Sequence, residues 1–331
     1  MLRAGIIGCG RIASSFSNTS RRGYSRTHMG AYQGAKDIEV IAVCDINKKN
    51  LKECLNKWDI QRGYLNYKEM LEKEKIDIVS ICTPVESHYF LIKEVTKNKH
   101  IRAIFCEKPI SDNIRDANKI IELCQKRNIL LMVNHQRRFA PFYQELKQNI
   151  SSGKLGKIQQ VNCYYTRGIF NTGTHILDLF CFLFGEPEWI TAIYSQNKFP
   201  FKEDPNLDVV IKFKKDLLIT VKACNDAYYL IFEIDILTSK ARMQLGAEFE
   251  YSQISPGKNL LGKNQLIKIK NPPFKSKYKS ISLTYGVKHI INCLRGKEKP
   301  LSSGNDAIKA LKLIKAGISS AENKGKRIYL D

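Results

Sequence analysis

The chain has 331 residues, of which 43% are hydrophobic and 26% charged, values typical of a globular protein large enough for two domains. Because no run of about 18 uninterrupted apolar residues occurs, we expect no membrane helix. The first residues, M-L-R-A-G-I-I-G, lead straight into a strand-like segment. We therefore expect no signal peptide and a cytoplasmic protein.

The net charge is +22, from 54 lysines and arginines against 32 acidic residues. Such a surplus attracts polyanions, which include nucleic acids and anionic substrates. The basic residues are spread along the whole chain, without a basic block that contains interleaved aromatic residues. We therefore expect no nucleic-acid partner, and we keep an anionic small molecule as the alternative.

The ten cysteines are scattered, with neither a C-x-x-C pair nor a Cys/His cluster at zinc spacing. This pattern indicates reduced, mostly buried thiols rather than a disulfide framework or a metal site. We expect no metal.

A buried strand is predicted at residues 3–7, and G-C-G-R-I-A (8–13) follows it directly. The first glycine allows a tight turn, and the second lets the backbone approach a pyrophosphate. The small Ala13 permits close helix packing, and the helix N-terminus offers N–H donors to phosphate. The cofactor-binding candidates in this loop are Gly8, Gly10, Arg11 and Ile12.

The second strand is predicted at residues 38–44 and ends at Asp45. An acidic residue at this place accepts hydrogen bonds from the adenosine ribose. The distance from the glycine loop is longer than usual, which we interpret as an inserted loop over residues 14–26. Because no arginine follows Asp45 to meet a 2′-phosphate, we expect NAD rather than NADP.

Strands and helices alternate over the first 133 residues, which predicts a parallel, doubly wound α/β sheet. Helices are expected at 48–58, 67–74, 87–98 and 111–127, the last with Ser111 as its cap, and strands at 76–82, 103–106 and 129–133. Parallel strands present ligands at their carboxyl ends. The residues expected at this edge are Thr83, Pro84, His88, Glu107 and Lys108.

Lys108 follows the apolar strand A-I-F-C directly and precedes Pro109. A lysine at this position is suited to act as a positioned acid or base. The alternative is a solvated lysine at a surface strand end. For His28, His88 and His289 the sequence indicates no chemical partner, so core or surface positions are expected, with His88 near the cofactor edge.

Beyond residue 133 the pattern changes, and we expect a second domain over residues 134–331. Several strand-like runs between residues 189 and 269 predict a largely antiparallel sheet, so this domain is α+β. Residues 258–279 are basic and are expected to form surface loops. Helices are predicted at 141–152, 171–184, 285–294 and 306–322.

The stretch N-T-G-T-H-I-L-D (171–178) places His175 at a helix start. Residues three or four positions apart share a helix face, so Asn171 and Asp178 are both expected near His175. A histidine can transfer protons near neutral pH. The alternative is a capping asparagine beside a packed histidine.

Taken together, these motifs resemble the Gfo/Idh/MocA oxidoreductases over nearly the whole chain. The resemblance is carried by G-C-G-R-I-A (8–13), V-C-D (43–45), S-I-C-T-P-V-E-S-H (80–88), C-E-K-P (106–109), R-R-F-A-P (137–141), S-G-K-L-G-K-I (152–158) and S-G-N-D-A (303–307). It implies an N-terminal Rossmann domain that binds a nicotinamide cofactor. It also implies a C-terminal domain whose open sheet mediates homodimers or homotetramers.

By this resemblance, Lys108 contacts the substrate and helps to move the hydroxyl proton, and His175 is the acid/base candidate. The family's first acidic position in the histidine motif is Asn171 here, as in nucleotide-sugar-modifying members. Arg167 is expected near the site and suits phosphate or carboxylate recognition. Arg137 is a further substrate-binding candidate, although the arginine pair at 137–138 equally fits a hinge salt bridge.

The sequence thus predicts an NAD-dependent oxidoreductase that acts on a CH–OH group of a sugar, nucleotide-linked or otherwise anionic. The alternatives are an NADPH-dependent keto-sugar reductase and a non-catalytic nucleotide-binding sensor or scaffold on the same fold.

Overall fold

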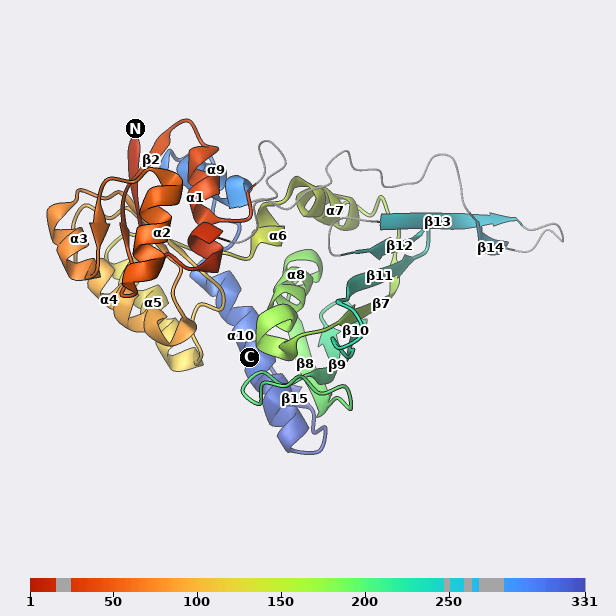
Figure 1. The fold of residues 1–331 in the computed structure, drawn as a ribbon. Coiled ribbons are helices and arrows are strands. Elements are labelled where there is room, and N and C mark those ends of the chain that lie inside the picture. Colours follow the sequence, from red (N-terminus) through yellow and green to blue (C-terminus); the bar gives the residue numbers. More distant parts are fainter. Residues whose placement is uncertain (16–24, 247–250, 259–263, 268–282, 331) are drawn as a thin grey trace. The chain divides into compact units, whose positions relative to one another are not determined.

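The computed structural model describes residues 1–15, 25–246, 251–258, 264–267 and 283–330 (Figure 1). The chain divides into two compact units. The first comprises Met1–Ala140 and Ile281–Leu311, and the second comprises Pro141–Ser280 and Lys312–Asp331. Each unit contains its own sheet.

The first unit contains a six-stranded sheet in the order β3-β2-β1-β4-β5-β6, with every neighbouring pair parallel. The strands are β1 (Leu2–Ile7), β2 (Ile38–Cys44), β3 (Gly63–Tyr64), β4 (Ile78–Ile81), β5 (Ala103–Cys106) and β6 (Leu130–Val133). The order reverses between β1 and β4, which is the topological switch point of a Rossmann sheet. The predicted doubly wound fold is confirmed.

Helices cover both faces of this sheet (Figure 1). Those of the first unit are α1 (His28–Gln33), α2 (Lys48–Trp58), α3 (Tyr67–Lys73), α4 (His88–Val95), α5 (Ile114–Lys126), α6 (Gln136–Phe139), α9 (Leu283–Leu294) and the start of α10 (Gly304–Glu322), with short turns η1 (Arg11–Ser15) and η2 (Val85–Ser87). Helix α1 packs against α9, and α4 packs against α5. Strands β4 and β5 are buried at every residue, as expected for a sheet covered on both faces.

Asparagine side chains begin three of these helices. Asn47 accepts hydrogen bonds from the first turn of α2, and Asn66 does the same for α3. The Asn113 side chain accepts from the backbone N–H of Asp116 at the start of α5. The prediction that Ser111 caps this helix was therefore wrong, because the backbone turns helical only after Asn113.

The two compact units divide the chain differently from the predicted domains 1–133 and 134–331. Residues 134–140 and the segment Ile281–Leu311 lie with the first unit, not the second. The reason is apolar packing, because Leu283, Val287 and Ile290 of α9 are fully buried in the same core as Phe105 of β5. The chain passes between the units three times, after Ala140, after Ser280 and after Leu311 within α10.

The second unit contains a nine-stranded sheet in the order β14-β13-β12-β11-β7-β10-β9-β8-β15. Its strands are β7 (Ile158–Tyr165), β8 (Pro187–Tyr194), β9 (Leu207–Phe213), β10 (Leu217–Ala223), β11 (Phe232–Thr238), β12 (Arg242–Leu245), β13 (Tyr251–Lys258), β14 (Asn264–Ile267) and β15 (Ile328–Tyr329). All neighbours are antiparallel except β7 and β10. The predicted largely antiparallel sheet is confirmed.

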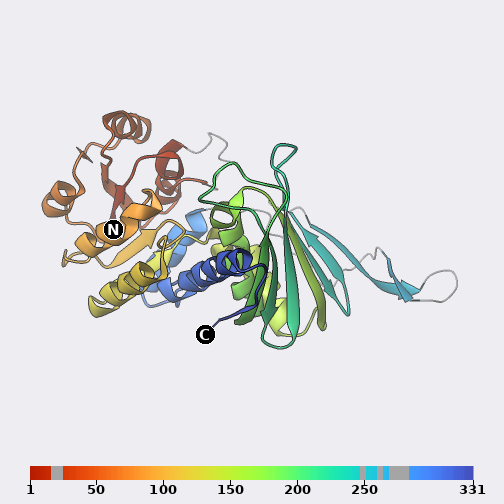
Figure 2. The same cartoon turned by 90° about the horizontal axis from the view of Figure 1, so that it is seen from below.

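One face of this sheet is covered (Figure 2). The helices of this unit are α7 (Pro141–Ser151), η3 (Gly168–Gly173), α8 (Thr174–Phe184) and the second half of α10. Burial alternates along β9 and β11, and Gly317 of α10 lies against Ile190 and Leu207. On the opposite face, the exposed side chains include Tyr164, Ile193 and Leu218.

Two predictions concern segments that the structure describes only in part. Residues 16–24 of the predicted inserted loop lie outside the described residues. So do 259–263 and 268–279 of the predicted basic loop, but strand β14 lies within that stretch and pairs with β13. Among the described residues, no helix is long and apolar enough to cross a membrane.

Candidate active site

The glycine loop follows β1 at the carboxyl edge of the first sheet. Gly8 has a φ of +93°, and a Cβ there would lie 2.7 Å from the Cys82 carbonyl oxygen, so the turn requires glycine. At Gly10 a Cβ would meet no atom within 4 Å. That open space fits close approach of a ligand to the backbone, which is what a bound pyrophosphate needs.

Asp45, at the end of β2, is bound to this loop. One carboxylate oxygen accepts a hydrogen bond of 2.7 Å from the Cys9 backbone N–H, and the other accepts one of 2.8 Å from Asn47. Asp45 is only half-buried, so its oxygens keep access for further donors such as ribose hydroxyls. Arg11 is exposed and Ile12 is half-buried in the helical turn η1.

The ends of β4 and β5 are joined by His88. Its Nε2 lies 3.0 Å from the Thr83 carbonyl oxygen, and its Nδ1 lies 3.1 Å from that of Pro109. Burial lowers the pKa of His88 despite these bonds, which favours the neutral ring. His88 thus contacts the turn after each strand, and the neighbouring Pro84 is exposed.

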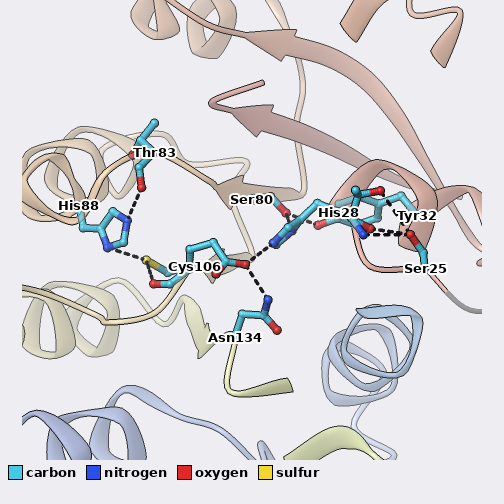
Figure 3. A network of polar contacts seen from close by, with 10 residues as sticks. Ser25, His28, Tyr32, Ser80, Thr83, His88, Cys106 and Asn134 are labelled. Carbon is cyan, nitrogen blue, oxygen red and sulfur yellow. Dashed lines mark hydrogen bonds and ion pairs between the residues drawn. The ribbon is translucent and has the colours of Figure 1, made fainter. Parts of the chain in front are cut away.

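Glu107 lies in a buried polar network with His28 and Asn134, whose side chains are labelled in Figure 3. Its Oε1 accepts a hydrogen bond of 2.6 Å from the Asn134 amide and lies 2.8 Å from His28 Nε2. The other ring nitrogen of His28 lies 3.0 Å from the Ser80 hydroxyl, which lies 2.7 Å from the Tyr32 hydroxyl. The network therefore links α1 with strand β4 and the ends of β5 and β6.

The charge state of Glu107 follows from these contacts. Burial raises the pKa of this carboxyl, but the hydrogen bond and charge of His28, the bond from Asn134 and the charge of Lys108 outweigh it. The net result is a lowered pKa. Glu107 is therefore a carboxylate at neutral pH, next in sequence to the candidate lysine.

Lys108 is half-buried, and the peptide bond to Pro109 is cis. Glu107 on one side is held by the network, and the Pro109 carbonyl on the other side contacts His88. The lysine backbone thus lies between two fixed points at the carboxyl edge of the sheet.

The arginine pair of α6 is buried. Arg138 donates to the Leu301 carbonyl and forms an ion pair of 3.1 Å with Asp306 at the start of α10. For this arginine pair, the sequence left two alternatives open, a substrate contact and a structural salt bridge. Arg138 forms the salt bridge. The substrate-binding role of Arg137 stays a prediction.

In the second unit, the predicted substrate segment begins with a strained turn. Arg167 has a φ of +68°, which is unusual for a residue with a side chain, and its exposed guanidinium lies 3.9 Å from Asp226. Both oxygens of Asp204 accept backbone hydrogen bonds here, at 2.6 Å from Phe170 and 3.0 Å from Asn171. Asp204 therefore holds the start of η3.

His175 lies in the first turn of α8 and is half-buried, Asp178 is fully buried one turn later, and Asn171 is exposed in η3. The predicted helical placement is observed, with the regular helix starting at Thr174. Because Lys108 belongs to the first unit and His175 to the second, their pairing stays a prediction.

Sequence reasoning missed three positioning residues, namely His28, Asn134 and Asp204. His28 and Glu107 are 79 positions apart, so no local spacing indicates their contact. Asn134 directly follows β6, and an analogy with the other strand ends would have found it. In the part of the chain that the structure describes, no group of three or more His, Cys, Asp or Glu side chains is placed to hold a metal ion.

Comparison with known proteins supplies the family. Residues 2–135 match the model of an oxidoreductase family with an NAD-binding Rossmann fold, and residues 147–330 match the C-terminal alpha/beta domain of the same family. A D-apiose dehydrogenase of Paraburkholderia graminis is 24% identical, over 99% of this chain and 89% of that protein. A myo-inositol 2-dehydrogenase of Thermotoga maritima is 28% identical, over 47% of this chain and 42% of that protein.

Among solved structures, the WlbA dehydrogenase of Bordetella pertussis, in complex with NADH and UDP-GlcNAcA, superposes with a TM-score of 0.78. It is 22% identical, and the match covers 100% of this chain and 99% of that one. This similarity shows the shared fold. With both family models matched, the chain belongs to the Gfo/Idh/MocA oxidoreductases and carries their NAD-binding Rossmann domain.

Proposed function

We propose that this protein is an NAD-dependent dehydrogenase that moves hydride between the nicotinamide and a CH–OH carbon of an anionic sugar, with a nucleotide-linked sugar as the first candidate. The observation that carries the proposal is the junction of the glycine loop and Asp45. Gly10 leaves open space beside its backbone, and the Cys9 N–H is bound to the carboxylate of Asp45. An acidic side chain at this place favours NAD over NADP, because it repels a 2′-phosphate.

In this proposal, the cofactor supplies the hydride chemistry and the protein supplies position and proton transfer. Lys108 contacts the reacting hydroxyl from its held position between Glu107 and Pro109. His175 is the second group that takes or gives the proton. Asn171 donates to or accepts from a sugar hydroxyl, since an amide cannot take the proton.

Two features support an anionic substrate. Arg167 is held in a positive-φ conformation with its guanidinium half-exposed, which suits binding of phosphate or carboxylate. The net charge of +22 attracts anions in general. Relatives named for inositol and apiose act on neutral compounds, whereas the WlbA structure holds UDP-GlcNAcA. The nucleotide-linked substrate is therefore the part of the proposal that most needs a test.

We also propose that the protein assembles as a homodimer or homotetramer through the sheet of the second unit. Apolar side chains on the outer face of that sheet, among them Tyr164, Ile193 and Leu218, support it. Mass measurement by light scattering tests this proposal, and a monomer at micromolar concentration would contradict it.

The function is tested by following NADH formation with purified protein, NAD and a substrate panel of UDP-GlcNAcA, myo-inositol and D-apiose. We expect turnover with UDP-GlcNAcA and little with the neutral compounds. Turnover of myo-inositol or D-apiose without turnover of UDP-GlcNAcA would support the proposed dehydrogenase activity. It would contradict the proposal that the substrate is anionic. Consumption of NADPH with a keto-sugar would favour the reductase. Cofactor binding without turnover of any sugar tested would favour a sensor.

A further inference from the structure

We propose that His28 is a positioning residue for Lys108 and acts through the buried carboxylate of Glu107. The inference deepens the proposed function, since it assumes that Lys108 works on the substrate. It concerns a residue of α1 that no catalytic motif of the sequence contains.

His28 contacts side chains that neighbouring strands bring together. Ser80 lies on β4, Glu107 directly follows β5, and Asn134 directly follows β6, so three neighbouring strands bring polar groups to one buried place. His28 bridges two of them, with Nδ1 at 3.0 Å from Ser80 and Nε2 at 2.8 Å from Glu107 (Figure 3). The histidine thereby determines where the Glu107 carboxylate lies, and Lys108 is the next residue.

The polar network around His28 extends into the core of the first unit. Beyond His28 the contacts continue through Ser80 to Tyr32, which is 1% exposed. Burial raises the pKa of this tyrosine, so it stays protonated. Among the described residues, these contacts lead into the core. A static role that fixes charge and position fits this arrangement better than a proton path to water.

The charge of Glu107 acts on several neighbouring titratable groups. Burial and the charge of Glu107 both raise the pKa values of Cys82 and Cys106, and the same charge partly offsets the lowering of the His88 pKa by burial. Lys108 and His28 are the cationic or potentially cationic partners of Glu107. Although burial raises the pKa of Glu107, the charge of Lys108 is among the causes that lower it, so this carboxylate and this lysine interact electrostatically.

The first unit contains a matched control. His289 of α9 is also buried and forms a histidine–carboxylate pair, with Glu298. The Glu298 side chain is 43% exposed, against 11% for that of Glu107. His289 accepts a hydrogen bond from the Leu301 backbone N–H and lies outside the candidate site, so its variants report on the loss of a buried histidine–carboxylate pair away from Lys108.

Two substitutions separate the contacts of His28. The amide of asparagine occupies the place of Nδ1, so His28→Asn retains the contact with Ser80 and loses that with Glu107. The longer His28→Gln places its amide at Nε2 and retains the contact with Glu107. If His28 has only a structural role, both variants should lose stability to a similar extent and affect Lys108 alike. If His28 positions Lys108, only His28→Asn should change the reactivity of the lysine.

The test is the rate at which acetic anhydride labels Lys108 as a function of pH, measured by peptide mass spectrometry on folded protein without substrate. We expect His28→Asn and Glu107→Gln to shift the labelling midpoint to lower pH by about one unit, or about tenfold in rate at a fixed lower pH. His28→Gln and His289→Gln should follow the wild type. If the labelling curves of His28→Asn and Glu107→Gln coincide with that of the wild type, the inference is wrong. Equal shifts in both His28 variants would also overturn it.

Turnover provides the second readout. With a substrate identified, His28→Asn should lower kcat by about tenfold to hundredfold and leave the Kd for NADH within about twofold. A parallel loss of NADH binding would instead indicate damage to the whole edge of the sheet. Because the labelling needs no substrate, it decides the inference even if the proposed function fails.

Discussion

The two candidate catalytic segments are held in different ways. In the first unit, the segment around Lys108 is fixed by side chains in the core, since Glu107 binds His28 and Asn134. In the second unit, the segment before His175 is fixed through its backbone, since Asp204 accepts two N–H groups at the start of η3. A buried carboxylate influences the charge of its neighbours, whereas a half-buried one at a loop mainly sets a conformation.

This difference has a practical consequence. Substitutions in the first network should change proton transfer and its pH dependence. Substitutions around Asp204 should change substrate affinity more than the chemical step. Single substitutions in each unit can separate these two kinds of effect.

Lys108 itself provides the largest effect. Lys108→Ala should lower kcat by about 10²- to 10⁴-fold, because the positioned amine no longer takes part in proton transfer. NADH binding, measured by fluorescence titration, should change little. The exposed Lys126 of α5 offers a control, and its alanine variant should keep the full rate. Retained turnover in Lys108→Ala would remove the lysine from the mechanism.

Asp45 tests the cofactor edge of the same unit. Asp45→Ala removes a charged acceptor and releases the Cys9 N–H, so the Kd for NADH should rise about tenfold to hundredfold. Fluorescence titration of NADH provides the measurement. The exposed Asp37 before β2 is the matched control. Unchanged affinity in Asp45→Ala would show that the ribose binds elsewhere.

Asp204 tests the second unit. In Asp204→Asn only one side-chain oxygen remains to accept a hydrogen bond from the backbone. The new NH₂ group faces the second backbone N–H, and two donors cannot bond to each other. The start of η3 should therefore be held less firmly. We expect KM to rise about tenfold with kcat nearly unchanged. The exposed Asp216, in the same unit, is the control. A loss confined to kcat would contradict the division drawn above.

Acid should destabilise the first unit through Glu107. Its pKa in the folded protein is lowered, so its contribution to stability is complete above the ordinary value of about 4.3 and is lost as the pH falls through the folded value. The lowered pKa of Asp306 beside Arg138 acts in the same direction, although burial opposes it. Urea midpoints should therefore fall between about pH 5 and pH 3.

Glu107→Gln should flatten this dependence and lower the stability at neutral pH by about 2 kcal/mol, because His28 loses a charged partner. The same urea series on the variant measures both effects. A slope identical to that of the wild type would mean that Glu107 does not titrate in this range.

Substitutions of the two loop glycines should differ in their effect on stability. Gly10→Ala meets no atom, so the free energy of unfolding should change by less than about 0.5 kcal/mol while NADH binds more weakly. Gly8→Ala should destabilise by about 1–3 kcal/mol, because of its positive φ and the nearby Cys82 carbonyl. Thermal unfolding and NADH titration of both variants provide the comparison.

Much of the first unit was predictable from local pattern. Apolar runs such as Ala103–Cys106 predict buried strands, and the parallel order then places Asp45 and Lys108 at one edge. Helix α1 was missed because it follows a stretch rich in serine, arginine and glycine that masks its start. Without α1, His28 could not be assigned a partner.

Long-range packing explains the other misses. The amphipathic pattern of α9 predicts a helix but does not say which core receives Val287 and Ile290. Asp204 lies 33 positions after Asn171, in a loop whose path depends on the sheet between them. In both cases the sequence shows the element, and only the tertiary structure shows its neighbour.

We propose that the Rossmann unit binds NAD at Asp45. Calorimetric titration of the purified protein with NADH and, separately, with NADPH tests this cofactor assignment. We expect a Kd for NADH in the micromolar range or below and much weaker binding of NADPH, because the carboxylate repels a 2′-phosphate. Tighter binding of NADPH, or binding of neither cofactor, would contradict it.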